Sequence, residues 1–385
     1  MRITFITLGY APRPSGGVKV IYEYANQLAA RGHEVTVVHP RWLRKIRLRD
    51  VGQSVLTNLL RPRRLAGVGL QLLAQVHFWL TGIGGRHSPS ITIPHVPWYQ
   101  LHSNVRLLLV PEPAPCYVPD GDAVFWYWGK DHPPEKGQPF HLVQGYGVFD
   151  KAQEDAVIRA PVPEIAIARW LYEEALRLGV PRDELIYIPN GIDHSKYRLV
   201  NPIDKRPARV AMMYSPASIK GPKDGVRALD LARQRFPALQ AVLFGVCRRP
   251  RTLPGWIEYH RDPAQQELVE HIYNGSSIYL CPSWLEGFHL PPAEAMACGC
   301  ALVSTDIGGV RDYAEDGVTA LLSPPRQPEA LAENLLRLLE DVELRTRLAK
   351  AGHERIQEFT WERSARMFEK FLIEKTQPSP QLALS

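Results

Sequence analysis

The stretch from Ser276 to Leu322 constrains the fold of this chain more than any other part of its sequence. It predicts, in order, a strand at Ile278–Cys281, a tight loop, a helix from Pro291 to near Gly299, a strand at Ala301–Ser304 and a turn at Gly308-Gly309. Prolines in the first turn of a helix cost no hydrogen bond, because those N–H groups have no partner within the helix. The free donors and the positive end of the helix dipole suit an anion.

Two carboxylates flank this helix start. Glu286 lies in the loop, and Glu294 lies about one helical turn beyond the proline pair. Both can therefore face one polyhydroxylated ligand whose phosphates lie at the helix end. Glutamates near a helix start also serve simply to complement the dipole. The spacing of the pair alone leaves both interpretations open.

The complete string is more specific than the two glutamates. It reads E-G-F-x-L-P-x-x-E-A-M-A-x-G, with G-G-V-x-D after the next strand, and it resembles the signature of the family 4 glycosyltransferases, retaining enzymes of the GT-B fold. The resemblance implies that Glu286 contacts the donor sugar and that Glu294 holds the ribose hydroxyls. It implies a donor-binding role for Gly287, Phe288, His289, Leu290, Gly308 and Gly309. Where the family usually has glycine this chain has His289, whose imidazole can donate to phosphate or narrow the sugar pocket.

The N-terminus predicts a strand, a helix and a second strand, at Arg2–Leu8, Val20–Ala30 and Glu34–Val38. This βαβ order predicts a parallel sheet. The Gly16-Gly17 pair precedes the helix, where missing side chains let the backbone approach a ligand, although such a pair can also be only a turn. The family resemblance implies that the pair binds the donor across the interdomain cleft. The chain lacks GxGxxG here, which argues against a Rossmann dehydrogenase.

A short motif marks the predicted division of the chain. Pro189-Asn190-Gly191-Ile192-Asp193 resembles the P-N-G-V-D link of the family, and Asn-Gly predicts a tight turn, with positive φ available, that can act as a hinge. We predict an α/β protein with two Rossmann-like domains whose parallel sheets face one another across a cleft. The predicted parts are an acceptor-side domain (1–190), a donor-nucleotide domain (195–358), a helix crossing back to the first domain (359–375) and a disordered tail (376–385).

The predicted diphosphate contacts depart from the family pattern R-x(4 or 5)-K-G. Lys220-Gly221 matches its second half, but Tyr214 and Ser215 occupy the places where the arginine is expected. An ammonium pairs with phosphate as a point charge, whereas a guanidinium forms a bidentate fork. Three interpretations stay open: Lys223 compensates, a more distant arginine compensates, or the diphosphate is held more weakly.

Two further motifs bear on the chemistry. Gln144 ends the strand HLVQGY, where the family commonly has histidine, and glutamine can bind a sugar hydroxyl but cannot titrate. Asp120-Gly121-Asp122 resembles the metal-binding DxD motif of another glycosyltransferase architecture, but a Pro-Asp-Gly turn explains it without metal. We therefore predict Gln144, Glu286 and Lys220 as catalytic residues, and neither a metal nor a cofactor.

The charge balance and the hydropathy of the chain limit the kinds of ligand and surface that it can bind. The excess of six basic over acidic residues permits a sugar nucleotide or an anionic membrane, and no nucleic-acid motif is present. Residues 41–64 hold eight Arg or Lys against one Asp, and an apolar segment follows. Residues 41–83 therefore predict either a peripheral membrane contact or a solvated helix, with the second favoured.

The cysteines and the N-terminus indicate the compartment. The five cysteines form no CxxC or Cys/His framework, which indicates a reducing environment. The N-terminus starts directly with a strand and is broken by Pro12 and Pro14, so that it lacks the apolar core of a signal peptide. We expect a cytoplasmic protein, with or without contact at the inner face of the membrane.

The resemblance implies transfer of a hexose from a nucleoside diphosphate sugar to an acceptor hydroxyl, with retention of configuration. The acceptor class implied is a glycan, a lipid-linked saccharide or a cell-surface polysaccharide. Two alternatives share the architecture. A sugar-nucleotide 2-epimerase needs titratable groups beside the sugar, which Gln144 does not provide. A non-catalytic subunit that binds the nucleotide sugar is compatible with the missing arginine.

Overall fold

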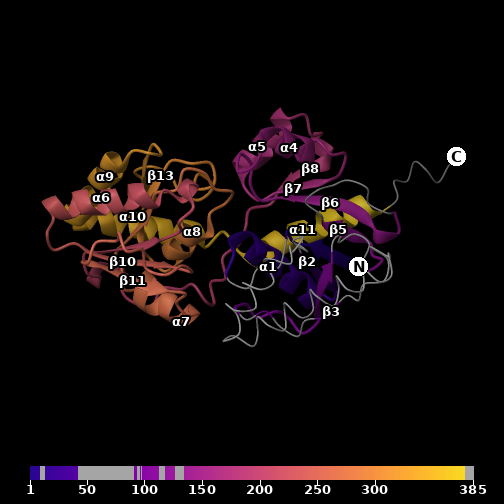
Figure 1. Cartoon of the computed structure of the whole chain (residues 1–385), viewed down its shortest axis with the longest axis horizontal. Helices are drawn as coiled ribbons and strands as arrows, with labels where there is room; N and C mark the ends of the chain where they lie inside the picture. The colour runs from indigo at the N-terminus through magenta and orange to yellow at the C-terminus, as the bar shows by residue number, and fades with distance from the viewer. Residues whose placement is uncertain are drawn as a thin grey trace, which may run out of the picture. The chain divides into compact units, whose positions relative to one another are not determined.

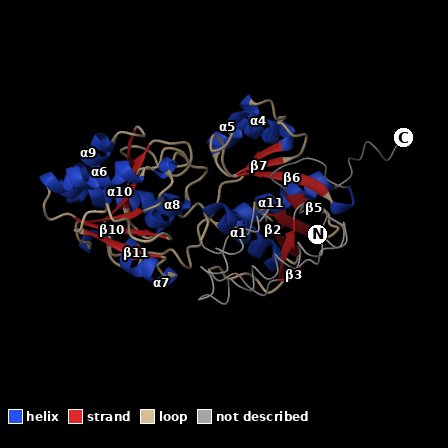
Figure 2. Ribbon diagram, in the orientation of Figure 1, coloured by secondary structure: helices blue, strands red, loops and turns tan. Residues whose placement is uncertain are grey.

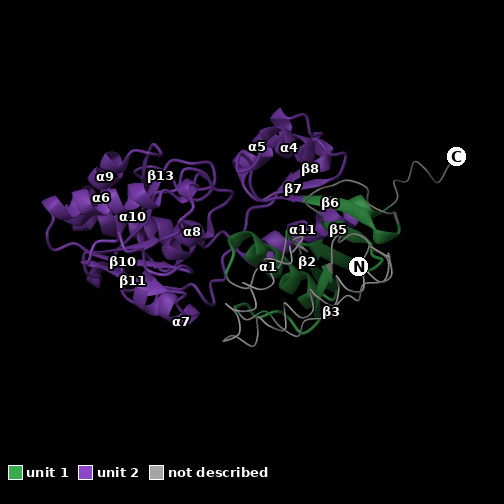
Figure 3. Cartoon of the chain, viewed as in Figure 1, with its two compact units in different colours: residues 1–141, 375–385 green, residues 142–374 purple. Residues whose placement is uncertain are grey.

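A computed structural model of the chain is shown in Figure 1. It describes residues 1–8, 14–41, 91–92, 96, 98–111, 118–125 and 134–377. The chain divides into two units, residues 1–141 with 375–385 and residues 142–374 (Figure 3). The domain boundaries predicted from the sequence, near residue 195 and at residue 359, stay predictions.

The first unit is built on a mostly parallel sheet. Its strands are β1 (Arg2–Ile6), β2 (Glu34–Arg41), β3 (Ile91–Thr92), β4 (Val105–Pro111), β5 (Ala123–Phe125) and β6 (Gln138–Val143), whose last two residues belong to the second unit. They lie in the order β3-β4-β2-β1-β5-β6, and only β3 among the described pairings runs antiparallel. The first βαβ unit is thus confirmed, because β1 and β2 pair in parallel and α1 (Gly16–Ala30) joins them.

Helix α1 begins four residues before the predicted start at Val20. Its buried face includes Val20, Tyr24 and Leu28, which recur every fourth residue and therefore share one side of the helix. Gly16 and Gly17 form its first, exposed turn. A Cβ on Gly16 would meet no atom within 4 Å, so packing does not require glycine there.

The second unit begins with a helix-strand-helix-strand segment. Its elements are α4 (Lys151–Ile158), β7 (Glu164–Ala166), α5 (Arg169–Arg177) and β8 (Leu185–Tyr187). β7 and β8 pair in parallel. Asp150 caps α4, because its side chain accepts a hydrogen bond from the Gln153 N–H at 3.1 Å.

A six-stranded, fully parallel sheet forms the rest of this unit (Figure 2). Its order is β11-β10-β9-β12-β13-β14, from the strands β9 (Arg209–Met213), β10 (Gln240–Gly245), β11 (Ile257–Arg261), β12 (Ile278–Cys281), β13 (Ala301–Thr305) and β14 (Ala320–Ser323). The strand order reverses between β9 and β12. The loops that follow these two strands therefore meet at the carboxyl edge of the sheet, the usual ligand position in open α/β sheets.

Helices join these strands and supply the other half of the core. They are α6 (Pro222–Arg235), the short α7 (Gln265–Glu267), α8 (Leu290–Ala297), α9 (Pro328–Glu340), α10 (Val342–Ile356) and α11 (Trp361–Thr376). Leu335 and Leu339 of α9 pack with Val210, Leu243 and Leu280 of the sheet. Among the described residues, no helix is both long enough and apolar enough to cross a bilayer.

The motif at residues 189–193 is held by the start of α11. The Ile192 N–H donates to the Phe359 carbonyl at 2.9 Å, and the Ser364 hydroxyl donates to the Pro189 carbonyl at 2.6 Å. A Cβ on Gly191 would lie 2.1 Å from the Trp361 nitrogen. Gly191 does not use the positive φ that is available to glycine; glycine is required there because two backbones approach closely.

Candidate active site

The loops after β9 and β12 carry the two charged residues that the sequence singled out, and these side chains bind each other. Nζ of Lys220 donates to both carboxylate oxygens of Glu286, at 2.7 and 2.6 Å. The Glu286 side chain is only 8% exposed and that of Lys220 26% exposed. Burial alone would raise the pKa of Glu286, but His289 and Lys220 outweigh it and hold that pKa below its usual value. The pair is thus an ionised, partly buried bridge.

Backbone and indole contacts fix this pair. The Trp284 N–H donates to the Ile219 carbonyl at 2.7 Å, and its indole Nε1 donates to Asp224 at 2.6 Å. Gly221 has φ +58° and follows Lys220 directly, and a Cβ there would lie 2.0 Å from the Pro282 carbonyl oxygen. Glycine is therefore required after Lys220, because only glycine allows the loop after β9 to fold against the loop after β12.

His289 lies beneath the same loop. Its Nε2 is 3.2 Å from Oε1 of Glu286, within ion-pair distance but without hydrogen-bond geometry, and its Nδ1 is 3.2 Å from Sγ of Cys281. Burial alone would lower the pKa of His289, but the Cys281 thiol and the Glu286 carboxylate outweigh burial and raise it. The pKa of the Cys281 thiol is correspondingly lowered by His289 against the effect of burial. The sequence did not indicate the partnership with Cys281.

The loop that enters α8 presents unused donors. Among the described residues, the backbone N–H groups of Gly287, Phe288, His289 and Leu290 donate to no acceptor. Leu290 begins α8, one residue before the predicted start at Pro291. Buried N–H groups are rarely left unpaired, because each costs about as much as a lost hydrogen bond. Four consecutive free donors next to Lys220 suit a bound anion.

Side chains of the same loop anchor it to the core. Phe288 is 1% exposed and packs against Tyr313 and Phe359. The Tyr313 hydroxyl donates to the His289 carbonyl at 2.9 Å. Phe288 and Leu290 can therefore offer a ligand only their backbone groups, since both side chains are buried.

Three glycines that we predicted to bind the donor pack closely together. A Cβ on Gly287 would lie 2.1 Å from the Gln144 carbonyl oxygen, and one on Gly309 would lie 2.2 Å from the Gly287 carbonyl oxygen. A Cβ on Gly308 would lie 2.3 Å from the ring of Trp170, whose Nε1 donates to the Gly287 carbonyl at 2.8 Å. Trp170 is thus a site neighbour that the sequence did not reveal, because it is 117 residues from Gly287.

Of the other predicted site residues, Glu294 and Gln144 lie in the second unit, and Gly16 and Gly17 lie in the first. Glu294 is buried on α8 and accepts a hydrogen bond from the Tyr273 hydroxyl at 3.4 Å. The Gln144 side-chain oxygen is buried and has no hydrogen-bond partner among the described residues, and the backbone carbonyl of Gln144 lies against Gly287. Gly16 and Gly17 belong to the first unit, and their predicted donor contact stays a prediction.

The two aspartates of the DxD sequence are engaged within the first unit. Asp120 pairs with Lys136 at 2.7 Å, and Asp122 accepts from the Arg2 N–H at 2.7 Å. Both carboxylates therefore hold the turn before β5 in place. The predicted membrane segment at residues 41–83 lies outside the described residues, apart from the backbone of Arg41.

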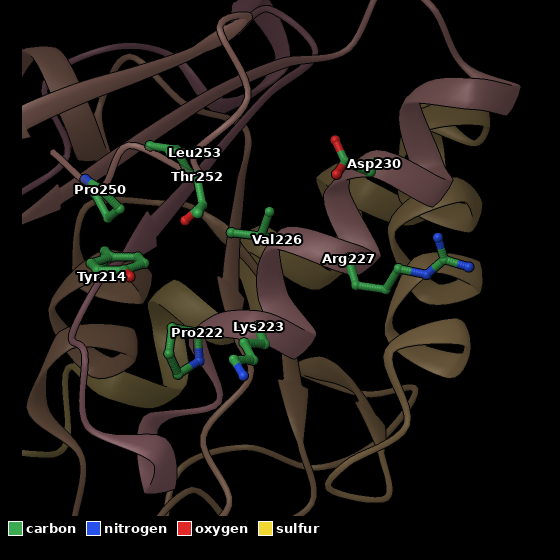
Figure 4. A pocket seen from close by; sticks show the side chains of 9 residues that line it. All are labelled: Tyr214, Pro222, Lys223, Val226, Arg227, Asp230, Pro250, Thr252 and Leu253. Atoms are coloured by element: carbon green, nitrogen blue, oxygen red, sulfur yellow. The ribbon is translucent and has the colours of Figure 1, made fainter.

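Tyr214, which occupies the place of the missing arginine, lines a pocket of about 250 Å³ (Figure 4). Its lining comes from the end of β9, α6 and the loop after β10: Tyr214, Pro222, Lys223, Val226, Arg227, Asp230, Pro250, Thr252 and Leu253. None of the predicted donor residues lines it. Lys223 therefore lines this pocket together with Tyr214, and its compensation for the missing arginine stays a prediction.

Asp312 ends the G-G-V-x-D motif and ties it to α5 and β8. It accepts from the Arg169 N–H at 3.1 Å and from the Tyr187 hydroxyl at 2.9 Å. Burial raises the pKa of Asp312 to about 6 despite these donors. The folded protein therefore binds the Asp312 proton more tightly than the unfolded chain does.

This raised pKa gives a pH prediction. A carboxyl whose pKa is about 6 when folded and about 3.9 when unfolded stabilises the fold fully below pH 3.9, and that contribution is lost as pH rises through 6, about 3 kcal/mol in total. We expect Asp312→Asn to melt at or above the wild-type temperature at pH 7. The difference in melting temperature between variant and wild type should shrink or reverse from pH 7 to pH 4. A difference that does not change with pH contradicts the prediction.

The fold is that of the GT-B class, and part of the chain is similar to known glycosyltransferases. Residues 194–355 match the family model described as Glycosyl transferases group 1. The D-inositol 3-phosphate glycosyltransferase of Frankia alni is 38% identical over 104 residues, 27% of this chain and 26% of that protein. The protein of the same name from Paenarthrobacter aurescens is 26% identical over 210 residues, 49% of this chain and 51% of that protein.

The chain spans about half the length of these curated relatives or less. Among solved structures, Anabaena HepE in complex with UDP-glucose has a TM-score of 0.65 at 14% identity, over 97% of this chain and 100% of that chain. The predicted GT-B fold is confirmed, and the predicted resemblance to family 4 glycosyltransferases is confirmed for the part of the chain that these proteins match.

Proposed function

We propose that the chain is a retaining glycosyltransferase that moves a hexose from a nucleoside diphosphate sugar to an acceptor hydroxyl. The observation that carries this proposal is the run of four free backbone N–H groups, Gly287 to Leu290, beside the Lys220–Glu286 bridge. The glycosyltransferase relatives and the UDP-glucose complex of HepE support a nucleotide-sugar donor. Retention follows from the family resemblance.

The site has what departure of a nucleoside diphosphate requires. Negative charge develops on the leaving phosphate, and preorganised donors stabilise it without reorganisation of solvent. Lys220, the loop N–H groups and the start of α8 supply positive charge, so that the proposed reaction requires neither metal nor cofactor. Glu286 and the free oxygen of Gln144 are acceptors for sugar hydroxyls.

For the acceptor and the cellular compartment we propose only a general class. Relatives named for D-inositol 3-phosphate support an acceptor that bears hydroxyl groups, and we propose a glycan, a lipid-linked saccharide or a cell-surface polysaccharide. Cys247, Cys281, Cys298 and Cys300 are free thiols, which supports a cytoplasmic setting. Membrane contact through residues 41–83 is proposed on the sequence alone.

A donor panel tests the function. The full chain is incubated with UDP-, GDP-, dTDP- and ADP-sugars, with and without a mixture of saccharide acceptors, while nucleotide release and sugar products are followed. We expect one nucleotide to be released together with a new glycoside that keeps the anomeric configuration of the donor. Turnover of the donor sugar without acceptor would instead show an epimerase. Donor binding without any turnover would show a non-catalytic subunit.

A further inference from the structure

We propose that His289 is a positioning residue that lets Lys220 leave Glu286 and bind the donor diphosphate. The inference rests on the proposed function, because it assumes that a diphosphate enters this site. It concerns a position where the chain has a histidine in the positive-φ region, at the entrance to α8.

The first step is that Lys220 is already occupied. Its ammonium donates to both oxygens of Glu286, and that carboxylate is almost fully buried. A phosphate that takes Lys220 therefore leaves a buried carboxylate without its strongest partner. Breaking a buried ion pair in this way is strongly unfavourable unless another cation replaces the one removed.

The second step is that a replacement cation is already in place. Nε2 of His289 lies 3.2 Å from Oε1 of Glu286, on the loop three residues further along. The position of the ring is fixed, because Nδ1 contacts Cys281 and the Tyr313 hydroxyl holds the His289 carbonyl. No movement of the backbone is needed for the imidazolium to remain with Glu286.

The third step concerns the charge state of His289. Three titratable or charged groups face the ring: Cys281 from β12, Glu286 from the same loop and Lys220 from the turn before α6. Burial lowers the pKa of His289, but Cys281 and Glu286 outweigh burial and Lys220, so that this pKa is raised above its ordinary value and the imidazolium is favoured. Its positive charge compensates Glu286 while Lys220 moves to the phosphate.

The test measures nucleotide affinity against pH. Dissociation constants of UDP, GDP, dTDP and ADP are measured by calorimetry between pH 6 and 9 for wild type, His289→Gln and His289→Gly. For the nucleotide that wild type prefers, we expect affinity to fall about tenfold as His289 deprotonates, at a pH above the ordinary histidine value of about 6.5. His289→Gln should bind about tenfold more weakly at pH 6.5 and lose this fall.

Controls separate charge from packing. Glutamine keeps most of the volume and hydrogen bonding of histidine, and glycine suits the φ of +68° at this position, so at least one variant should fold. His353→Gln on α10 removes a histidine outside the site and should keep the wild-type pH profile. In a Lys220→Met background, His289→Gln should have no further effect, because the ion pair that it serves is absent.

Several results overturn the inference. In the first, His289→Gln binds the nucleotide with the affinity and the pH profile of wild type. In the second, His289→Gln binds the nucleotide more weakly but keeps the wild-type pH profile. In the third, His289→Gln still weakens nucleotide binding in the Lys220→Met background. If wild type binds none of the four nucleotides, the proposed function fails and the inference fails with it. Nucleotide binding by wild type with any of the first three results leaves the proposed function standing and removes only the role of His289.

Discussion

Glu286→Gln is expected to lower kcat for glycosyl transfer by about 10²–10³-fold, the usual loss when one preorganised transition-state contact is removed. The affinity for the nucleoside diphosphate should be unchanged or higher. The reason is structural: Glu286 holds the Lys220 ammonium in its bidentate bridge, and its loss leaves that ammonium free for the phosphate. The measurement is kcat with the preferred donor, together with calorimetric binding of the matching nucleoside diphosphate.

Glu294→Gln is the matched control, a second buried carboxylate of the same motif. It should weaken nucleotide binding, because the resemblance assigns Glu294 to the ribose hydroxyls, and its kcat should fall less than that of Glu286→Gln. Melting temperatures of both variants show whether the fold is kept. Equal loss of nucleotide affinity in both variants would mean that the two glutamates have been assigned to the wrong parts of the donor.

Local signals in the sequence were sufficient for the frame of this site. The proline pair and the glycine after it predicted α8 to within one residue at its start, because both act on the backbone where they stand. The alternation of apolar strands with helical patterns predicted parallel sheets, because a helix between two strands lets both strands run in the same direction. Lys220 and Glu286 were found because each lies in a contiguous motif after its strand.

The contacts that complete the site could not be found in this way. Trp170 and Gly287 are 117 residues apart, and Arg169 and Asp312 are 143 apart, so no local pattern joins them. Cys281 reads in the sequence as a buried apolar residue at the end of a strand, and only the fold brings its thiol to His289. The three glycines of the site were predicted as ligand contacts, whereas the structure shows that close packing also requires them.

Gly221→Ala is expected to destabilise the second unit by about 3 kcal/mol or more. A left-handed conformation costs an ordinary residue about 1–2 kcal/mol, and crowding in a packed region adds about 1–3 kcal/mol. At Gly221 both terms apply, since φ is +58° and a Cβ would lie 2.0 Å from the Pro282 carbonyl oxygen. Thermal unfolding followed by circular dichroism should show a decrease in melting temperature of roughly 6–12 °C.

Alanine substitutions at two other glycines separate the cost of the left-handed backbone from the cost of crowding. Gly179 has φ +97°, and a Cβ at this position would meet no atom within 4 Å, so Gly179→Ala reports the cost of the left-handed backbone alone. Gly255 has an ordinary φ and the same open surroundings, so Gly255→Ala should be close to neutral. The expected order of destabilisation is Gly221, then Gly179, then Gly255. If Gly221→Ala and Gly179→Ala melt at the same temperature, the loop that carries Lys220 accommodates the added Cβ near Pro282 with no further loss of stability. The close approach of the two loops would then not be what holds the Lys220–Glu286 bridge in place.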